Sequence, residues 1–253
     1  MQWFEENFMK VNPEKFQLMF IIPENNVKDV PLQIAVNDEC TLKPNMEVKL
    51  LGVTIDCKLN FDPHVKEICK KASRQLKVLF RMKSLLGRSE KKIIFETFIV
   101  SCFNFCPIVW NFCGKSSMQT IEKIQERALR FVYDDSESSY SELLKKSGKC
   151  TMHVSRIKLF AMEMFKCINK LNPMFLNDIV IEKRMCKDFR DPSIMKIPKF
   201  NKIKYGKKTF SYYGPHIWNQ LPVILKDNLD FMTFKKLLST WNGPTCTCNC
   251  CNL

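Results

Sequence analysis

The chain has 253 residues, 45% of them hydrophobic, with 20 phenylalanines and only 7 glycines. This composition excludes a low-complexity protein, and the length is enough to bury one large core or two small ones. The 40 lysines and arginines exceed the 26 acidic residues and give a formal net charge of +14. Where this charge lies along the chain therefore bears on what the protein binds.

The positive charge is concentrated in two windows. Residues 66–92 hold ten basic and two acidic residues, and residues 183–208 hold the same numbers. Together the windows carry +16, so the rest of the chain is −2. Because a charge that served only solubility would be spread more evenly, this distribution predicts two basic surfaces. Pro192 and Pro198 indicate an extended loop in the second window.

Residues 1–60 predict a short helix followed by the edge of an antiparallel sheet. The helix covers residues 2–10, and strands are expected at 16–22, 31–36 and 47–56. The first ten residues are acidic where a signal peptide is basic, and no apolar segment follows them. We therefore expect an intracellular protein, in the cytoplasm or the nucleus.

The cysteines and the apolar stretches agree with that location. The 13 cysteines are an odd number, and several, such as Cys69 and Cys102, occupy apolar positions in helical patterns. We interpret them as reduced thiols that pack as small hydrophobic side chains. The longest apolar stretch, residues 93–110, contains Glu96 and Asn104, so we expect a buried helix there and no membrane partner.

Residues 62–86 form a predicted helix with two opposed faces. Asp62 and Pro63 are typical of a helix start, and Gly87 is placed to end the helix. At about 100° per residue, apolar and cationic side chains fall in two narrow arcs on roughly opposite sides. The apolar arc contains Val65, Ile68, Ala72, Leu76 and Leu79, and the cationic arc contains Lys66, Lys70, Arg74, Lys77 and Arg81.

The cationic face has two interpretations. A row of cations matches the repeating charge of a nucleic-acid backbone, and binding there would release condensed counterions. The alternative is an ordinary solvated face. Solvated faces usually mix charges of both signs, whereas Glu67 is the one acid near this row. Both interpretations therefore stay open.

Helical patterns continue to the end of the chain. Further helices are expected at residues 89–112, 117–133, 139–147, 153–170 and 230–241, with a compact aromatic segment at 210–222. The composition shifts at about residue 182, where the basic loop begins. The predicted fold is mainly α with a small antiparallel β portion at the N-terminus, an α+β fold with a helical bundle.

The last residues form a cysteine-rich tail. Cys246, Cys248, Cys250 and Cys251 could together bind Zn²⁺ or Cu(I). Tetrahedral four-cysteine sites normally use two separated pairs, however, and this tail has one cluster. An unstructured, oxidation-prone tail is therefore favoured, with a metal-binding protein as the alternative, and we expect no cofactor and no metal site.

Several motifs follow one another in a fixed order. They are Asn12-Pro13-Glu14-Lys15, VKLLGVTID at residues 48–56, Pro107 with Trp110, Ile124-Gln125 with Ala128-Leu129-Arg130, and Phe210, Gly214-Pro215, Trp218-Asn219 and Leu221-Pro222 with Phe234-Lys235. Their order and spacing resemble the reverse transcriptases of non-LTR retrotransposons, in the jockey-like and related LINE lineages. The similar region is the C-terminal part of those enzymes, after the catalytic aspartates.

The resemblance implies an order of parts. These would be a remnant of the palm and primer-grip strands at 1–60, a helical thumb-like domain at 61–181, the basic loop at 182–208, a C-terminal extension at 209–241 and the cysteine-rich tail at 242–253. Leu51 and Gly52 would belong to the primer grip. Lys15 would match a lysine near the leaving pyrophosphate. Without metal-binding aspartates Lys15 has no chemistry to assist, so we interpret it as a solvated lysine.

The catalytic carboxylates of that family have no counterpart in this sequence. Its polymerases hold two metal ions with carboxylates that include a Tyr/Phe-x-Asp-Asp hairpin, and this chain contains no such pattern. Its Asp134-Asp135 pair directly follows an aromatic residue and ends an amphipathic helix, which predicts a turn. His64, His153 and His216 have no catalytic partners by spacing. We therefore predict no catalytic residues.

The chain is predicted to be a truncated fragment of an RNA-directed DNA polymerase. This fragment would bind template and primer but would not polymerise by itself. The cations of residues 62–86 would contact phosphates of RNA and DNA without reading the sequence. Two alternatives remain, a helical protein–protein interaction module and a degenerate remnant with no present function. An interaction module should expose apolar patches rather than cations.

Overall fold

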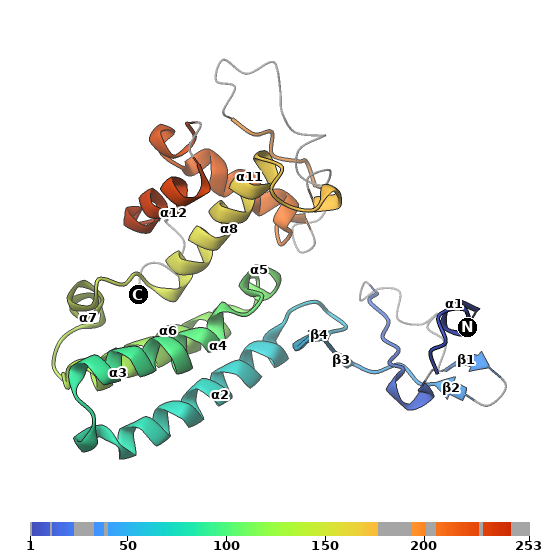
Figure 1. Cartoon of the computed structure of the whole chain (residues 1–253), viewed down its shortest axis with the longest axis horizontal. Coiled ribbons are helices and arrows are strands. Elements are labelled where there is room, and N and C mark those ends of the chain that lie inside the picture. The colour runs from blue at the N-terminus through green and yellow to red at the C-terminus, as the bar shows by residue number, and fades with distance from the viewer. Residues whose placement is uncertain are drawn as a thin grey trace. The chain divides into compact units, whose positions relative to one another are not determined.

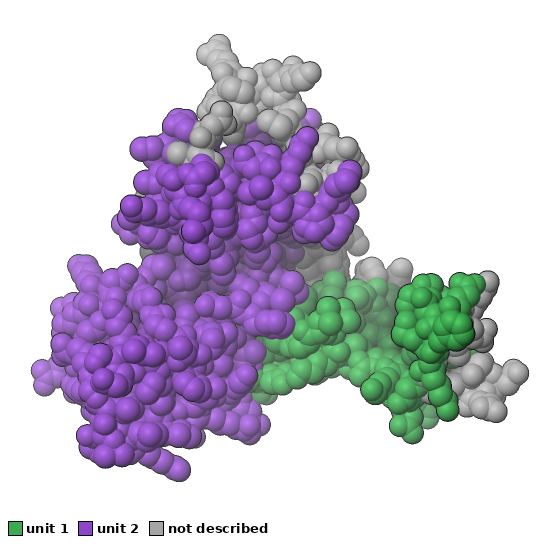
Figure 2. Space-filling model, viewed as in Figure 1, with its two compact units in different colours: residues 1–67 green, residues 68–253 purple. Residues whose placement is uncertain are grey.

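The computed structural model describes residues 2–10, 12–22, 33–37, 40–176, 194–200, 206–227 and 230–243. The chain divides into two compact units, residues 1–67 and 68–253 (Figure 2), and the boundary falls inside the long basic helix. The fold is mainly helical, with two small antiparallel sheets in the first unit. This confirms the predicted fold class.

The first unit contains two separate β-hairpins. β1 (Ile34–Asn37) pairs with β2 (Cys40–Leu42), and β3 (Glu47–Leu50) pairs with β4 (Val53–Asp56), both antiparallel. The strand predicted at 31–36 is confirmed within a few residues. The single strand predicted at 47–56 is instead a hairpin, because a two-residue turn lies at its centre.

The predicted N-terminal helix is confirmed but shorter than expected, and one predicted strand does not form. Helix α1 (Gln2–Glu6) ends before the predicted residue 10. Phe8, just beyond the helix, takes a left-handed conformation with φ 53°. No strand forms at 16–22, where Leu18 makes an isolated bridge with Pro44. Because Pro44 has no N–H to donate, a strand ladder cannot continue through it.

The helices that follow the hairpins confirm most of the predicted pattern (Figure 1). In chain order they are α2 (Asp62–Arg81), η3 (Lys83–Leu85), α3 (Arg88–Ile94), η4 (Phe95–Val100), α4 (Ser101–Asn104), α5 (Pro107–Trp110), α6 (Lys115–Tyr133), α7 (Tyr140–Ser147), α8 (Met152–Ile168), α11 (Phe210–Gln220), η5 (Val223–Leu225) and α12 (Phe231–Thr240). Local signals set several ends, such as the Ser139–Glu142 capping box that begins α7.

The helix predicted at 89–112 is broken near its end. α3, η4 and α4 continue into one another, with η4 in π-helical geometry, and the chain then turns before α5. The helix breaks at Cys106 because Pro107 disfavours a right-handed helical conformation in the residue before it, and Cys106 lies in the turn in a left-handed conformation with φ 45°. The indole N–H of Trp110 donates to the Phe105 carbonyl at 2.9 Å and holds the turn.

α2 ends at Arg81, five residues before the predicted end. Gly87 is extended (φ −74°, ψ 173°) and precedes α3, so it does not terminate α2 as predicted. Lys83, beyond the helix end, pairs with Asp134 at 3.0 Å. This contact joins residues far apart in sequence, which local spacing could not indicate.

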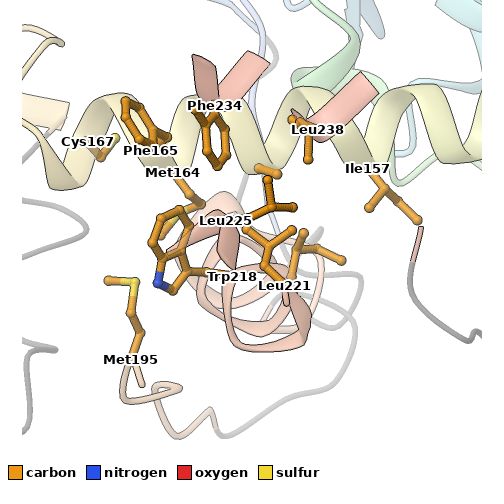
Figure 3. Close-up of a cluster of buried hydrophobic side chains, with 12 residues drawn as sticks. Ile157, Met164, Phe165, Cys167, Met195, Trp218, Leu221, Leu225, Phe234 and Leu238 are labelled. Atoms are coloured by element: carbon orange, nitrogen blue, oxygen red, sulfur yellow. The ribbon is translucent and has the colours of Figure 1, made fainter. Parts of the chain in front are cut away.

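The C-terminal helices share one hydrophobic core. α8 packs against α11 and α12, and Figure 3 shows Met164 and Phe165 of α8 near Phe234 of α12 and Trp218 of α11. The rings of Phe165 and Phe234 stack with centroids 4.3 Å apart. Gly214 allows the close approach of α11 to α8, because a Cβ there would lie 2.4 Å from the Met164 sulfur. The predicted aromatic segment is therefore a core helix.

A buried carboxylate joins α6, α7 and α8. Glu122 of α6 accepts hydrogen bonds from the Tyr140 hydroxyl at 2.7 Å and from the backbone N–H groups of Met152 at 3.1 Å and His153 at 2.8 Å. The two N–H groups belong to the first turn of α8, where helical donors have no partner within the helix. Glu122 therefore caps α8 from a different helix. Burial and the Glu122 charge raise the pKa of Tyr140, which stays a neutral donor.

His153 is expected to make the fold sensitive to acid. Both ring nitrogens are buried with no hydrogen-bond partner among the described residues. Burial, together with the Arg156 charge, lowers the pKa of His153 from 6.5 to about 4. As the pH falls through this range the unfolded chain binds a proton and the folded chain does not, so folded stability is expected to decrease.

A His153→Leu variant isolates this contribution. Between about pH 7.5 and about pH 4.5 the variant should lose roughly 2 kcal/mol less stability than the unmodified protein, because leucine takes up no proton. Urea unfolding of both proteins at the two pH values measures the difference. Equal losses in the two proteins would contradict the lowered pKa.

Some predictions concern residues that lie outside the description. These are residues 244–253 of the cysteine-rich tail and residues 177–193 and 201–205 around the basic loop. Within the described part of the chain, no helix is long and apolar enough to cross a membrane. The cysteines characterised there are free thiols, and burial raises the pKa of Cys69 to about 12.

Candidate nucleic-acid interface

The exposed face of α2 carries the five predicted cations. Helix geometry places them within an arc of about 80°, along about 22 Å of the axis. All five are exposed: Lys66, Lys70, Arg74, Lys77 and Arg81. The opposite face is buried at Val65, Ala72, Leu76 and Leu79 and partly buried at Ile68. The two-faced helix is thus confirmed, while its role in binding stays a prediction.

The acid beside this row is bonded to the β3–β4 hairpin. Glu67 accepts hydrogen bonds from the Lys49 ammonium at 3.0 Å and from the Thr54 hydroxyl at 3.1 Å. These bonds hold the pKa of Glu67 below its ordinary value. In the described part of the chain, none of the five cations forms an ion pair. Neighbouring side chains therefore leave the charge of the row uncompensated.

Buried groups fix the start of α2 to the same hairpin. Asp56, at the end of β4, accepts hydrogen bonds from three backbone N–H groups of residues 58–61, at 2.6 to 3.2 Å. His64 accepts a hydrogen bond from the Thr54 backbone N–H at 3.3 Å, and burial lowers the pKa of His64. Asp56 was not among the residues predicted from the sequence, although an aspartate ahead of a polar loop is a recognisable turn signal.

Leu51 and Gly52 form the tip of the β3–β4 hairpin. Their φ angles are 47° and 87°, and a two-residue turn that follows the twist of the strands requires positive φ at both positions. Glycine adopts this conformation without strain, whereas for Leu51 it costs on the order of 1 kcal/mol. The Leu51 side chain is 87% exposed. The hairpin thus presents a strained apolar tip, and its primer-grip role stays a prediction.

Lys15 ends the short helix η1 (Pro13–Lys15) in the first unit. Its side chain is exposed, and its backbone N–H donates to the Asn12 carbonyl at 3.2 Å. The Asn12 side chain in turn accepts from the Glu14 N–H at 3.0 Å. The asparagine and the lysine of the motif therefore belong to one local turn, which agrees with a solvated lysine.

Asp134 and Asp135 hold the turn between α6 and α7. Asp134 has φ 51° and pairs with Lys83 at 3.0 Å and with the buried Lys91 at 2.7 Å. Asp135 pairs with Lys146 and accepts hydrogen bonds from two backbone N–H groups of the turn. Hydrogen bonds from these lysines lower the pKa of each aspartate. Across the described residues, no group of three or more His, Cys, Asp or Glu could hold a metal ion.

Part of the chain is similar to a known transposon protein. Over 136 residues it is 26% identical to the probable RNA-directed DNA polymerase from transposon BS of Drosophila melanogaster. The resemblance to transposon reverse transcriptases is confirmed. The similar region covers 52% of this chain but only 15% of the relative, which is a much longer protein. No protein-family model matches the chain, and no solved structure gives a significant match.

Proposed function

We propose that this chain binds the template and primer strands of a retrotransposon reverse transcriptase through the cationic face of α2. The observation that carries the proposal is a row of five exposed cations in one arc, none in an ion pair with another described residue, on a helix whose opposite face is buried. Phosphates along the row would displace condensed counterions, which favours binding. Such contacts carry no base information, so binding would be independent of sequence.

The neighbouring parts fit the same function. The β3–β4 hairpin would act as the primer grip, with Leu51 and Gly52 at the primer end, and α2 would begin a thumb-like helical domain. The bonds from Glu67 to Lys49 and Thr54 would keep the hairpin in register with the start of α2. The similarity to a transposon polymerase supports a role related to reverse transcription, and free thiols support an intracellular location.

The chain by itself is expected to lack polymerase activity. Two-metal catalysis needs clustered carboxylates, yet the sequence contains no Tyr/Phe-x-Asp-Asp, and the carboxylates of Asp134 and Asp135 are bonded to lysines. Purified protein should extend no primer on an RNA or DNA template with Mg²⁺ or Mn²⁺, in an assay where an active reverse transcriptase does. Incorporation that tracks with the protein through purification would refute this expectation.

The salt dependence of duplex binding tests the proposed surface. If all five cations engage phosphates, log affinity should fall against log salt with a slope on the order of −4 to −5, at roughly 0.9 per phosphate. Duplexes of equal length and different sequence should bind alike. Fluorescence anisotropy of labelled duplexes measures both quantities, and binding that ignores salt would contradict the proposal.

A helical protein–protein interaction module is the second candidate. Ile93 and Phe98, on α3 and η4, are 63% and 51% exposed, and such apolar side chains are what an interaction module would use. The exposed part of α2 includes Val78 and Phe80, but its row of five cations favours nucleic acid. Removing cations from α2 would not weaken an interaction made by Ile93 and Phe98, so variants of the two surfaces separate the candidates.

A further inference from the structure

α11 has a second face that its role in the core does not use. Its inner face contributes Tyr213, Ile217 and Trp218 to the packing with α8. Its outer face carries Tyr212 and His216, one helical turn apart and both partly exposed. Their rings are nearly parallel, at 15°, with centroids 6.4 Å apart. The outer face therefore presents two aromatic rings to solvent in similar orientations.

The segment 194–200 extends this aromatic face. The Asn219 amide bonds to both the N–H and the carbonyl of Met195, each at 2.8 Å, and Met195 is buried in the C-terminal core. At the other end of the segment, the Phe200 ring packs edge-on against Tyr212 with centroids 5.1 Å apart. Two separate contacts thus hold the segment along α11.

Gly206 makes the position of Phe200 possible. A Cβ at residue 206 would lie 2.3 Å from the Phe200 Cβ, so a larger residue would displace the ring. At the far end of the row, a hydrogen bond of 3.0 Å joins the Gln220 amide to the His216 ring. Both ends of the aromatic row are therefore positioned by specific contacts.

Exposed cations flank the row. The Lys207 ammonium lies 5.6 Å from the centre of the Phe200 ring. Lys199 directly precedes Phe200, Lys208 follows Lys207, and all three lysines are exposed. Among the described residues, none of the three takes part in an ion pair. Surfaces that bind single-stranded nucleic acid combine aromatic rings, on which bases stack, with cations that contact the phosphates. This surface has both components.

We infer that Phe200, Tyr212 and His216, with Lys199, Lys207 and Lys208, form a binding surface for single-stranded RNA or DNA. Bases would stack on the Tyr212 and His216 rings, and the lysines would contact the phosphates between them. A duplex fits this surface less well, because its bases already stack on one another and hide their faces. The inference goes beyond the α2 proposal and does not rest on it.

The test compares strands with and without bases. The full chain is titrated by fluorescence anisotropy with a labelled thymidine oligonucleotide and with an abasic strand of the same length and charge. The thymidine strand should bind more tightly. Tyr212→Ala should weaken binding of this strand by roughly 5- to 100-fold, as expected when a stacking ring is lost, and should leave binding of the abasic strand unchanged.

Matched variants keep the result interpretable. Tyr212→Phe retains the ring and should bind within about twofold of the unmodified protein, and His216→Ala should reproduce the direction of the Tyr212→Ala effect. Duplex affinity should be unchanged in all three variants, which distinguishes this surface from α2. Equal binding of the thymidine and abasic strands by the unmodified protein would overturn the inference. Equal losses in Tyr212→Ala and Tyr212→Phe would also overturn it.

Discussion

Replacing Lys70, Arg74 and Lys77 with glutamine is expected to remove most of the salt dependence of duplex binding. At roughly 0.9 per phosphate contact, losing three of five contacts flattens the log–log slope by roughly two to three units. A fourfold rise in salt concentration should then lower the duplex affinity of the unmodified protein by roughly 500-fold and that of the triple variant by only about 10-fold. Anisotropy titrations at several salt concentrations measure the two slopes.

The fold should survive this change. All three side chains are exposed, and no ion pair involves them within the described structure. Surface substitutions of that kind usually alter stability by less than about 0.5 kcal/mol. Thermal unfolding followed by circular dichroism checks this point before the binding data are interpreted.

A second triple variant controls for net charge. Lys115, Lys123 and Lys145 are also exposed, but they lie on α6 and α7. Their replacement with glutamine changes the net charge of the chain by the same amount and should leave the slope close to that of the unmodified protein. If both triple variants flatten the slope equally, or neither does, then the α2 row is a solvated face. The basic loop at 183–208 would become the next candidate, testable by deletion.

α2 could be predicted from the sequence because the signal for it is local. A periodic apolar arc and an Asp-Pro start are both set within a few turns of helix. The end of the helix was misplaced, because α2 ends at Arg81 and Gly87, predicted to end it, instead precedes α3. The break at Cys106 had a local signal in Pro107 that the apolar periodicity of 89–112 concealed.

The aromatic face of α11 and the buried Glu122 of α6 both depend on contacts between residues far apart in the sequence, which no local pattern encodes. Asn219 bonds to Met195, 24 residues away, and the Phe200 ring packs against Tyr212 of α11. Glu122 resembles any helical glutamate in the sequence, yet the structure shows it only 5% exposed and bonded to the start of α8. Such roles follow from how helices pack, which periodicity alone does not determine.

Glu122→Ala is expected to produce a large loss of stability. The change removes the acceptor of two backbone N–H groups at the start of α8 and leaves Gln125, at 2.6 Å, as the remaining acceptor of the Tyr140 hydroxyl. Each buried donor left without a partner costs about 1 to 3 kcal/mol, so the free energy of unfolding should fall by about 3 to 5 kcal/mol. The melting temperature should fall by roughly 6 to 20 °C, at about 2 to 4 °C per kcal/mol for a unit of this size.

Three further variants attribute this loss to the hydrogen bonds of Glu122. Tyr140→Phe removes one donor and should cost about 1 kcal/mol. Glu122→Gln retains a side-chain oxygen as an acceptor and should fall between Glu122→Ala and the unmodified protein. Glu137→Ala removes an exposed glutamate and should change stability by less than about 0.5 kcal/mol. If Glu122→Ala were no more destabilising than Glu137→Ala, the carboxylate would not join α6, α7 and α8.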